Sequence, residues 1–82
     1  MYNMHMVTVF KHRKFKIIIY ENDHLPEHVH ILGPDFELKI MINSGECYYA
    51  RGAKQTTINK LEKLVKDNKD LLIAAWEEIH EE

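Results

Sequence analysis

The hydrophobic pattern of the chain changes period once, and this change limits the folds that the chain can adopt. Up to about residue 50, apolar side chains form continuous or alternating runs; in residues 36–42 every second position is Phe, Leu or Ile. Such runs are typical of strands. From about residue 56 onward, apolar residues recur at helical spacing. Strands followed by helices predict an α+β domain, with the helices packed on one face of an antiparallel sheet.

The first half divides into four to five predicted strands, which follow one another as an antiparallel β-meander between about residues 6 and 50. Residues 7–10 and 15–20 flank a polar tetrad that predicts a four-residue hairpin loop. Residues 17–20 do not alternate, which indicates a central strand covered on both faces. Three further strands are predicted at residues 28–32, 36–42 and 46–50.

The second half predicts two helices between about residues 56 and 80, within a single domain that spans residues 1–82. Thr56 or Thr57 is available as the N-cap of the first helix, and Asn68 as the N-cap of the second. The apolar face of the second helix is expected to consist of Leu71, Leu72, Ala75, Trp76 and Ile79.

Composition narrows the class of protein. With 45% hydrophobic and 29% charged residues, the chain is typical of a folded globular domain. Its net charge of −2 argues against a uniformly basic nucleic-acid coat. Cys47 is the single cysteine and cannot form an internal disulfide, so we expect a buried thiol and a cytoplasmic location. No stretch approaches the roughly 18 apolar residues that a membrane span needs.

Charge is distributed in blocks along the chain. Residues 1–20 carry Lys11, Arg13, Lys14 and Lys16 and no acid, whereas the last twelve residues carry four glutamates and no lysine or arginine. Such blocks are commonly solvated faces. The alternative is a basic edge that meets phosphate or an acidic partner.

Three of the six histidines lie within seven positions: His24, His28 and His30. His28 and His30 are two residues apart on a predicted strand, so their rings leave the same face of the sheet. Pro26 favours a turned approach that lets His24 return toward the end of the strand. Parity with the next strand predicts that His30 lies near Glu37 or Lys39, and His28 near Lys39 or Met41.

This cluster is compatible with three kinds of chemistry. His24, His28 and His30 suit zinc or another divalent metal, with Glu27, Asp23 or water completing the coordination.

In a metal-free alternative, His28 and His30 share the general acid and base roles, and Lys39 or Arg51 stabilises the developing phosphorane charge. A third interpretation is a phosphate held between two imidazolium rings and Lys39. The histidines could also be plain hydrogen-bonded surface residues. The isolated His5, His12 and His80 are interpreted as structural or solvated residues.

Tyr48 and Tyr49 are adjacent on the last predicted strand, which places them on opposite faces. One of them is therefore expected in the core, and the other is free to stack on a base or cover the histidines.

The residues around the histidines resemble a small prokaryotic family, domain of unknown function 4160. The resemblance rests on residues 23–30, on the Asn-Ser-Gly-Glu turn at residues 43–46, and on the Trp-bearing helix at residues 71–79. The family signature is His-x-Pro-Pro-His-x-His, and Glu27 stands where the second proline is usual. The resemblance implies a component of a two-gene cassette similar to toxin–antitoxin modules, with a cognate small protein as its partner.

Two functional hypotheses follow. In the first, the domain acts on or binds RNA or DNA through its histidine site, by phosphodiester chemistry or with a bound metal. In the second, it is a non-enzymatic protein-binding module, an antitoxin or accessory partner that uses a sheet edge or the last helix. A small core and an exposed sheet edge also make a homodimer plausible.

Overall fold

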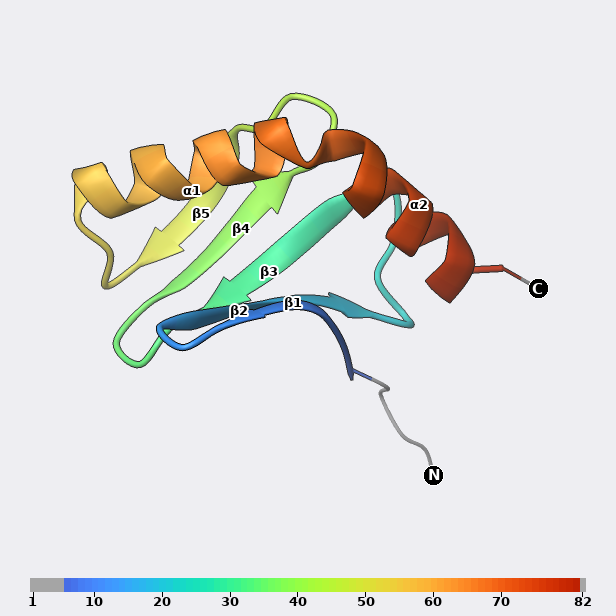
Figure 1. Ribbon diagram of the computed structural model, residues 1–82, viewed down its shortest axis with the longest axis horizontal. Coiled ribbons are helices and arrows are strands. Elements are labelled where there is room, and N and C mark those ends of the chain that lie inside the picture. Colours follow the sequence, from blue (N-terminus) through green and yellow to red (C-terminus); the bar gives the residue numbers. More distant parts are fainter. Residues whose placement is uncertain (1–5, 82) are drawn as a thin grey trace.

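A computed structural model describes residues 6–81 of the chain. The elements are β1 (Met6–His12), β2 (Phe15–Tyr20), β3 (His28–Leu32), β4 (Glu37–Met41), β5 (Cys47–Arg51), α1 (Gln55–Asp67) and α2 (Lys69–Ile79). Each strand pairs antiparallel with the next one in the chain, giving a sheet of order β1-β2-β3-β4-β5 (Figure 1). The prediction of an α+β meander with two C-terminal helices is confirmed.

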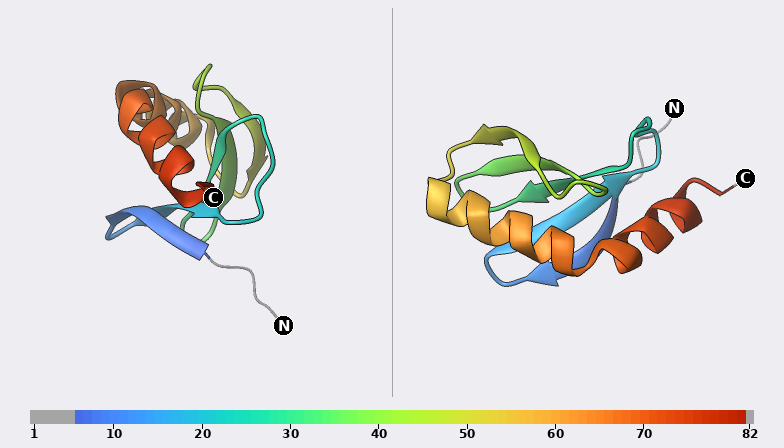
Figure 2. Two further views of the ribbon diagram at one scale, coloured as in Figure 1. Left: turned by 90° about the vertical axis from the view of Figure 1, so that its right-hand side faces the viewer. Right: turned by 90° about the horizontal axis from the view of Figure 1, so that it is seen from above.

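Both helices lie on the same face of the sheet, and the opposite face, which we term the outer face, has no described helix over it (Figure 2). The core forms between the helices and the covered face. Its buried members are Ile17, Ile19, Val29, Ile31, Leu38, Ile40, Ile42, Leu61, Val65, Leu72 and Trp76.

The strand register places alternate residues of each strand on the outer face. His30 lies opposite Ile18 of β2 on one side and opposite Lys39 of β4 on the other. His28 lies opposite Met41. Both neighbours are among those predicted from parity, because Val29 and Ile31 are fully buried and leave the histidines to the other face.

The first hairpin is tighter than predicted. His12 pairs with Phe15, so only Arg13 and Lys14 form the turn instead of a four-residue loop. The His12 ring stacks on Phe15 with centroids 4.8 Å apart, and its Nδ1 accepts the Lys14 backbone N–H at 3.1 Å. This aromatic pair extends the strand pairing to the end of the hairpin.

The last strand departs from simple alternation. Tyr49 lies opposite Lys39 and Cys47 opposite Ile40, so Tyr48 is an extra residue in β5 at a β-bulge. The expectation that one tyrosine is in the core is wrong, since Tyr48 is 50% and Tyr49 40% exposed. Cys47 is half-buried rather than buried, and its Sγ–H donates to the Tyr49 carbonyl at 3.0 Å.

The helix caps also differ from those predicted. Lys54 is the N-cap of α1 and makes no side-chain cap hydrogen bond, so Thr56 and Thr57 lie inside the first turn. Asn68 is the N-cap of α2 as predicted, but its side-chain amide donates backward to the Leu64 carbonyl at 2.8 Å. Asn68 therefore satisfies the end of α1 rather than the start of α2.

The buried face of α2 is narrower than predicted. Leu72 and Trp76 are buried, whereas Leu71 is 58% exposed. Residues four apart share one face of a helix, so α2 turns the stripe of Leu72 and Trp76 to the core and leaves Leu71 outside it. Within residues 6–81, no helix is both long and apolar enough to cross a membrane.

Candidate metal centre

The loop between β2 and β3 holds Asp23 at the end of β2. The Asp23 backbone N–H donates to the Tyr20 carbonyl at 3.0 Å, and the Tyr20 N–H donates to Asp23 Oδ2 at 3.0 Å. Short polar side chains commonly bond to nearby backbone in this way. The two hydrogen bonds fix the carboxylate beside the first residues of β3.

The two imidazole rings of β3 are held by aromatic neighbours. The His30 ring meets Tyr20 edge-on, with centroids 4.7 Å apart, and lies 5.2 Å from the His28 ring. The His28 ring lies 5.5 Å from Trp76 of α2 and 6.2 Å from Tyr48 of β5. Neighbours on three other elements thus restrict the orientation of both rings.

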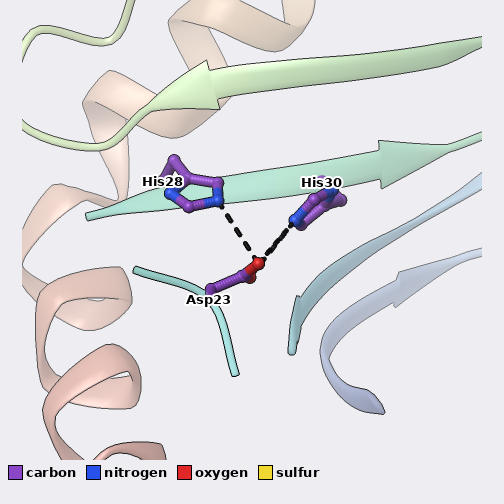
Figure 3. A group of neighbouring side chains, drawn as sticks. All are labelled: Asp23, His28 and His30. Carbon is purple, nitrogen blue, oxygen red and sulfur yellow. Dashed lines mark hydrogen bonds and ion pairs between the residues drawn. The ribbon is translucent and has the colours of Figure 1, made fainter. Parts of the chain in front are cut away.

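Asp23, His28 and His30 converge on one point (Figure 3). Asp23 Oδ1 lies 3.4 Å from His28 Nε2 and 3.2 Å from His30 Nε2. One ligand atom from each of the three residues lies within 4.8 Å of the other two. The three side chains are only 12–13% exposed, so each charge here is partly removed from water. The group is therefore a compact set of three potential metal ligands.

The proton on the His28 ring is located by its second hydrogen bond. His28 Nδ1 lies 2.9 Å from the Pro26 carbonyl, which can only accept, so Nδ1 carries hydrogen. In a neutral ring, Nε2 then directs a lone pair at the Asp23 carboxylate. That lone pair and the Asp23 carboxylate can therefore both be directed at one metal ion.

The two distances from Asp23 Oδ1 to the imidazole nitrogens fit a small tetrahedral ion. Zinc binds imidazole nitrogen and carboxylate oxygen at about 2.0–2.1 Å, which places two ligands at the tetrahedral angle about 3.3 Å apart. The separations of Asp23 Oδ1 from the two imidazole nitrogens, 3.4 and 3.2 Å, agree with this value. The Pro26 carbonyl on the far nitrogen of His28 is the kind of outer contact that orients metal-binding histidines.

The three residues lie in the wall of a cavity of about 450 Å³. The cavity is lined by Tyr20, Asn22, Asp23, His24, His28, His30, Lys39 and Tyr48. Three protein ligands beside an accessible hollow are typical of a catalytic metal site, in which the fourth position takes water or substrate.

The sequence predicted a partly different ligand set. His24 is exposed and lines the cavity, but it does not belong to the described group of three. Asp23, one of three candidates for completing the coordination, is in the group. Glu27 is engaged elsewhere, because its Oε1 accepts a hydrogen bond from the Asn43 side chain at 3.1 Å.

The two cations predicted to assist the histidines lie in different places. Lys39 lines the cavity, and its Nζ lies 4.9 Å from the centroid of the Tyr49 ring. Arg51 is not among the cavity-lining residues; its guanidinium donates to Glu37 Oε1 at 3.3 Å. That hydrogen bond raises the pKa of Arg51.

Tyr48 and Trp76 border the site; the sequence indicated Tyr48 only as one of two tyrosines that could cover the histidines, and it did not indicate that Trp76 lies beside them. Burial, and secondarily the negative charge of Asp23, raise the pKa of the Tyr48 phenol, so its hydroxyl remains a hydrogen-bond donor at neutral pH. The bulge that turns Tyr48 toward the cavity leaves no trace in the residue pattern. Trp76 was predicted as core; it is buried, and its ring also flanks His28.

Two of the isolated histidines are structural, as expected. His12 supports the first hairpin. His80 donates from Nδ1 to the Trp76 carbonyl at 2.8 Å, and its ring stacks on Trp76 at 4.1 Å. His5 lies outside the described residues.

Comparison with known proteins identifies a family. A family model described as "Domain of unknown function (DUF4160)" matches residues 14–77, which include the three converging residues and both helices up to the last turn of α2. No curated protein and no solved structure matches the chain.

Proposed function

The chain belongs to the DUF4160 family, whose description names no activity, and we propose a function from the geometry of the site. Asp23, His28 and His30 bind a divalent metal ion, with zinc as the first candidate. The bound ion serves the hydrolysis of phosphodiester bonds. One observation carries the proposal. The carboxylate oxygen and the two imidazole nitrogens converge within 4.8 Å of one another at the wall of a cavity.

The surrounding residues support an anionic substrate. A bound divalent ion supplies Lewis-acid polarisation and a water of lowered pKa. Lys39 lines the same cavity and can offer positive charge to a phosphate group. Tyr48 lines it too, and its hydroxyl is a hydrogen-bond donor suited to a phosphate oxygen. The chain thus provides both ligands and substrate contacts within one hollow.

The same geometry favours a second candidate, in which a proton takes the place of the metal. A doubly protonated His28 would donate to both the Pro26 carbonyl and Asp23. His28 and His30, 5.2 Å apart, would then act as a general acid and base without a cofactor. The two candidates differ in whether the site binds a metal ion, so a measurement of metal binding distinguishes them.

The test is a zinc titration by calorimetry, with elemental analysis of the untagged protein after dialysis. The proposal predicts one zinc per chain. Asp23→Asn keeps an acceptor for the Tyr20 N–H but removes the charge, and His28→Ala and His30→Ala each remove a ring. Each variant is expected to weaken zinc binding by about a hundredfold. Loss of a residue that only contacts a metal ligand weakens metal binding by up to about this factor, and these variants change the ligands themselves.

His12→Ala is the matched control, because it makes the same substitution at a histidine outside the group. It is expected to bind zinc as the parent does. Hydrolysis of bis-para-nitrophenyl phosphate, measured with and without chelator, tests the activity. The metal proposal fails if the parent retains no zinc or if all four variants bind it equally. Hydrolysis that persists in chelator and is abolished by His28→Ala would support the second candidate, acid–base catalysis without a metal.

A further inference from the structure

The outer face carries exposed aromatic rings beside a cation. Tyr48 and Tyr49 are 50% and 40% exposed, and the Lys39 ammonium lies 4.9 Å from the centroid of the Tyr49 ring. Exposed rings flanked by positive charge are suited to stacking on nucleobases, because every base has a π-face.

A second feature is the basic hairpin, which we define as Lys11, Arg13, Lys14 and Lys16. Lys11 lies directly opposite Lys16 in the strand register, and Arg13 and Lys14 form the turn. None of the four side chains has an ion-pair partner among residues 6–81. Like charges directly opposite each other destabilise a hairpin. A bound anion would remove this repulsion.

The basic hairpin borders a hollow large enough for an anionic group. A cavity of about 500 Å³ opens between the hairpin and residues 32–34. No aspartate or glutamate lines it; its walls are Lys11, His12, Arg13, Lys14, Phe15, Lys16, Leu32, Gly33 and Pro34. The His12 ring stacks on Phe15 at the end of the hairpin, which restricts the backbone that carries the four cations before any ligand binds.

The basic hairpin and Tyr49 are linked by the strand register on the outer face of the sheet. Lys16 and Ile18 are two residues apart on β2 and therefore share the outer face. Ile18 lies opposite His30, and the same row continues through Lys39 to Tyr49. Two residues along a strand span about 7 Å. A polymer that contacts Lys16 would therefore reach the row of His30 and Lys39 within a short distance.

We propose that the outer face binds single-stranded nucleic acid, with phosphates on the basic hairpin and bases stacked on Tyr48 and Tyr49. The inference deepens the proposed function, because it identifies the bound strand as the substrate of the metal centre, and that part of it rests on the proposed function. Binding itself requires no metal. Rings and cations together favour a single strand, because a duplex hides the faces of its bases and an acidic peptide would use the cations alone.

The test is fluorescence anisotropy with a labelled deoxythymidine oligonucleotide of about 12 nucleotides, a length within the site sizes of known single-strand binders. Chelator is present throughout, so that binding is measured apart from metal chemistry. The parent is expected to bind with an affinity that falls as salt rises. Lys11→Gln/Lys16→Gln removes two phosphate contacts and should reduce the slope of log affinity against log salt by about 1.4.

The matched control is Lys63→Gln/Lys69→Gln, which removes the same charge from the helices, where Lys63 pairs with Asp67. It should keep the parental salt slope. Tyr49→Leu keeps an apolar strand residue but removes the ring, and it should weaken binding by about fivefold or more. Circular dichroism checks that each variant is folded.

Several results would overturn the inference. One is equal binding by the parent and Lys11→Gln/Lys16→Gln; another is equal loss in both double variants, which would indicate a general charge effect. Equally tight binding to polyglutamate, to the duplex form of the oligonucleotide or to phosphatidylglycerol vesicles would also contradict it. Zinc titration of the same preparations distinguishes the two proposals. Oligonucleotide binding without zinc binding would contradict only the metal centre. Zinc binding without oligonucleotide binding would contradict only the nucleic-acid surface.

Discussion

The two faces of β3 perform different tasks with alternating residues. Val29 and Ile31 are fully buried under the helices, whereas His28 and His30 point to the outer face and meet Asp23. Because side chains alternate with a period of two, a slip of one residue would exchange the two sets. The register that builds the core therefore also builds the candidate metal centre.

The difference between the two faces predicts which property a substitution on each face should change. On the covered face, apolar burial stabilises the fold, and no polar or charged residue of the described chain is buried. On the outer face, like charges and partly desolvated ionisable groups lie close together, at a local cost to stability. Changes to the covered face should therefore alter stability, and changes to the outer face should alter binding.

The largest expected effect is on the covered face. Ile31→Ala removes a fully buried side chain and leaves a cavity, so it should lower the free energy of unfolding by about 2–5 kcal/mol. Urea denaturation followed by circular dichroism measures it. In conditions where the variant remains folded, zinc should still bind. A loss below about 1 kcal/mol would show that the two faces do not differ as described.

The next effect should come from the outer face when metal is added. Zinc at about a hundred times its dissociation constant should stabilise the parent by about 2.7 kcal/mol, because the ligand binds the folded state. Thermal denaturation with and without zinc measures the shift. At the same zinc concentration, the stabilisation should fall to about 0.4 kcal/mol in Asp23→Asn, whose affinity is expected to be a hundredfold weaker, and should be unchanged in His12→Ala. An equal shift in Asp23→Asn would mean that zinc binds elsewhere.

The smallest effect should be a gain in stability caused by a substitution, opposite in sign to the effect of Ile31→Ala. Lys11→Gln removes the repulsion across the first hairpin and should raise the free energy of unfolding by about 0.2–1 kcal/mol while weakening oligonucleotide binding. The gain should shrink in high salt, which screens exposed charges. Urea denaturation at low and high salt tests it. A loss of stability would indicate that Lys11 supports the fold rather than a ligand.

The alternation of apolar residues predicted the strands and placed His28 and His30 on the same face of the sheet. Buried alternation in β3 and β4 limited the cross-strand neighbour of His30 to Glu37 or Lys39, because a register shift of two residues keeps both apolar sets buried; the structure has Lys39 there. The same argument failed for Tyr48 and Tyr49, since a bulge adds a residue that no sequence period reveals.

The identity of the third converging residue depends on loop geometry. Three histidines in seven positions favoured His24 as a ligand, but backbone hydrogen bonds at Tyr20 bring its neighbour Asp23 to the imidazoles. Such bonds depend on the local path of the chain, which residue spacing does not encode. Asp23 was identified from sequence only as one of three alternatives.

The most direct test of the metal centre is a crystal structure of the zinc-loaded protein, with anomalous diffraction recorded at the zinc absorption edge. We predict one anomalous peak about 2.0–2.1 Å from Asp23 Oδ1 and from Nε2 of His28 and His30, with the fourth position open to the cavity. Zinc found only at other residues, or no peak in crystals grown with excess zinc, would contradict the assignment.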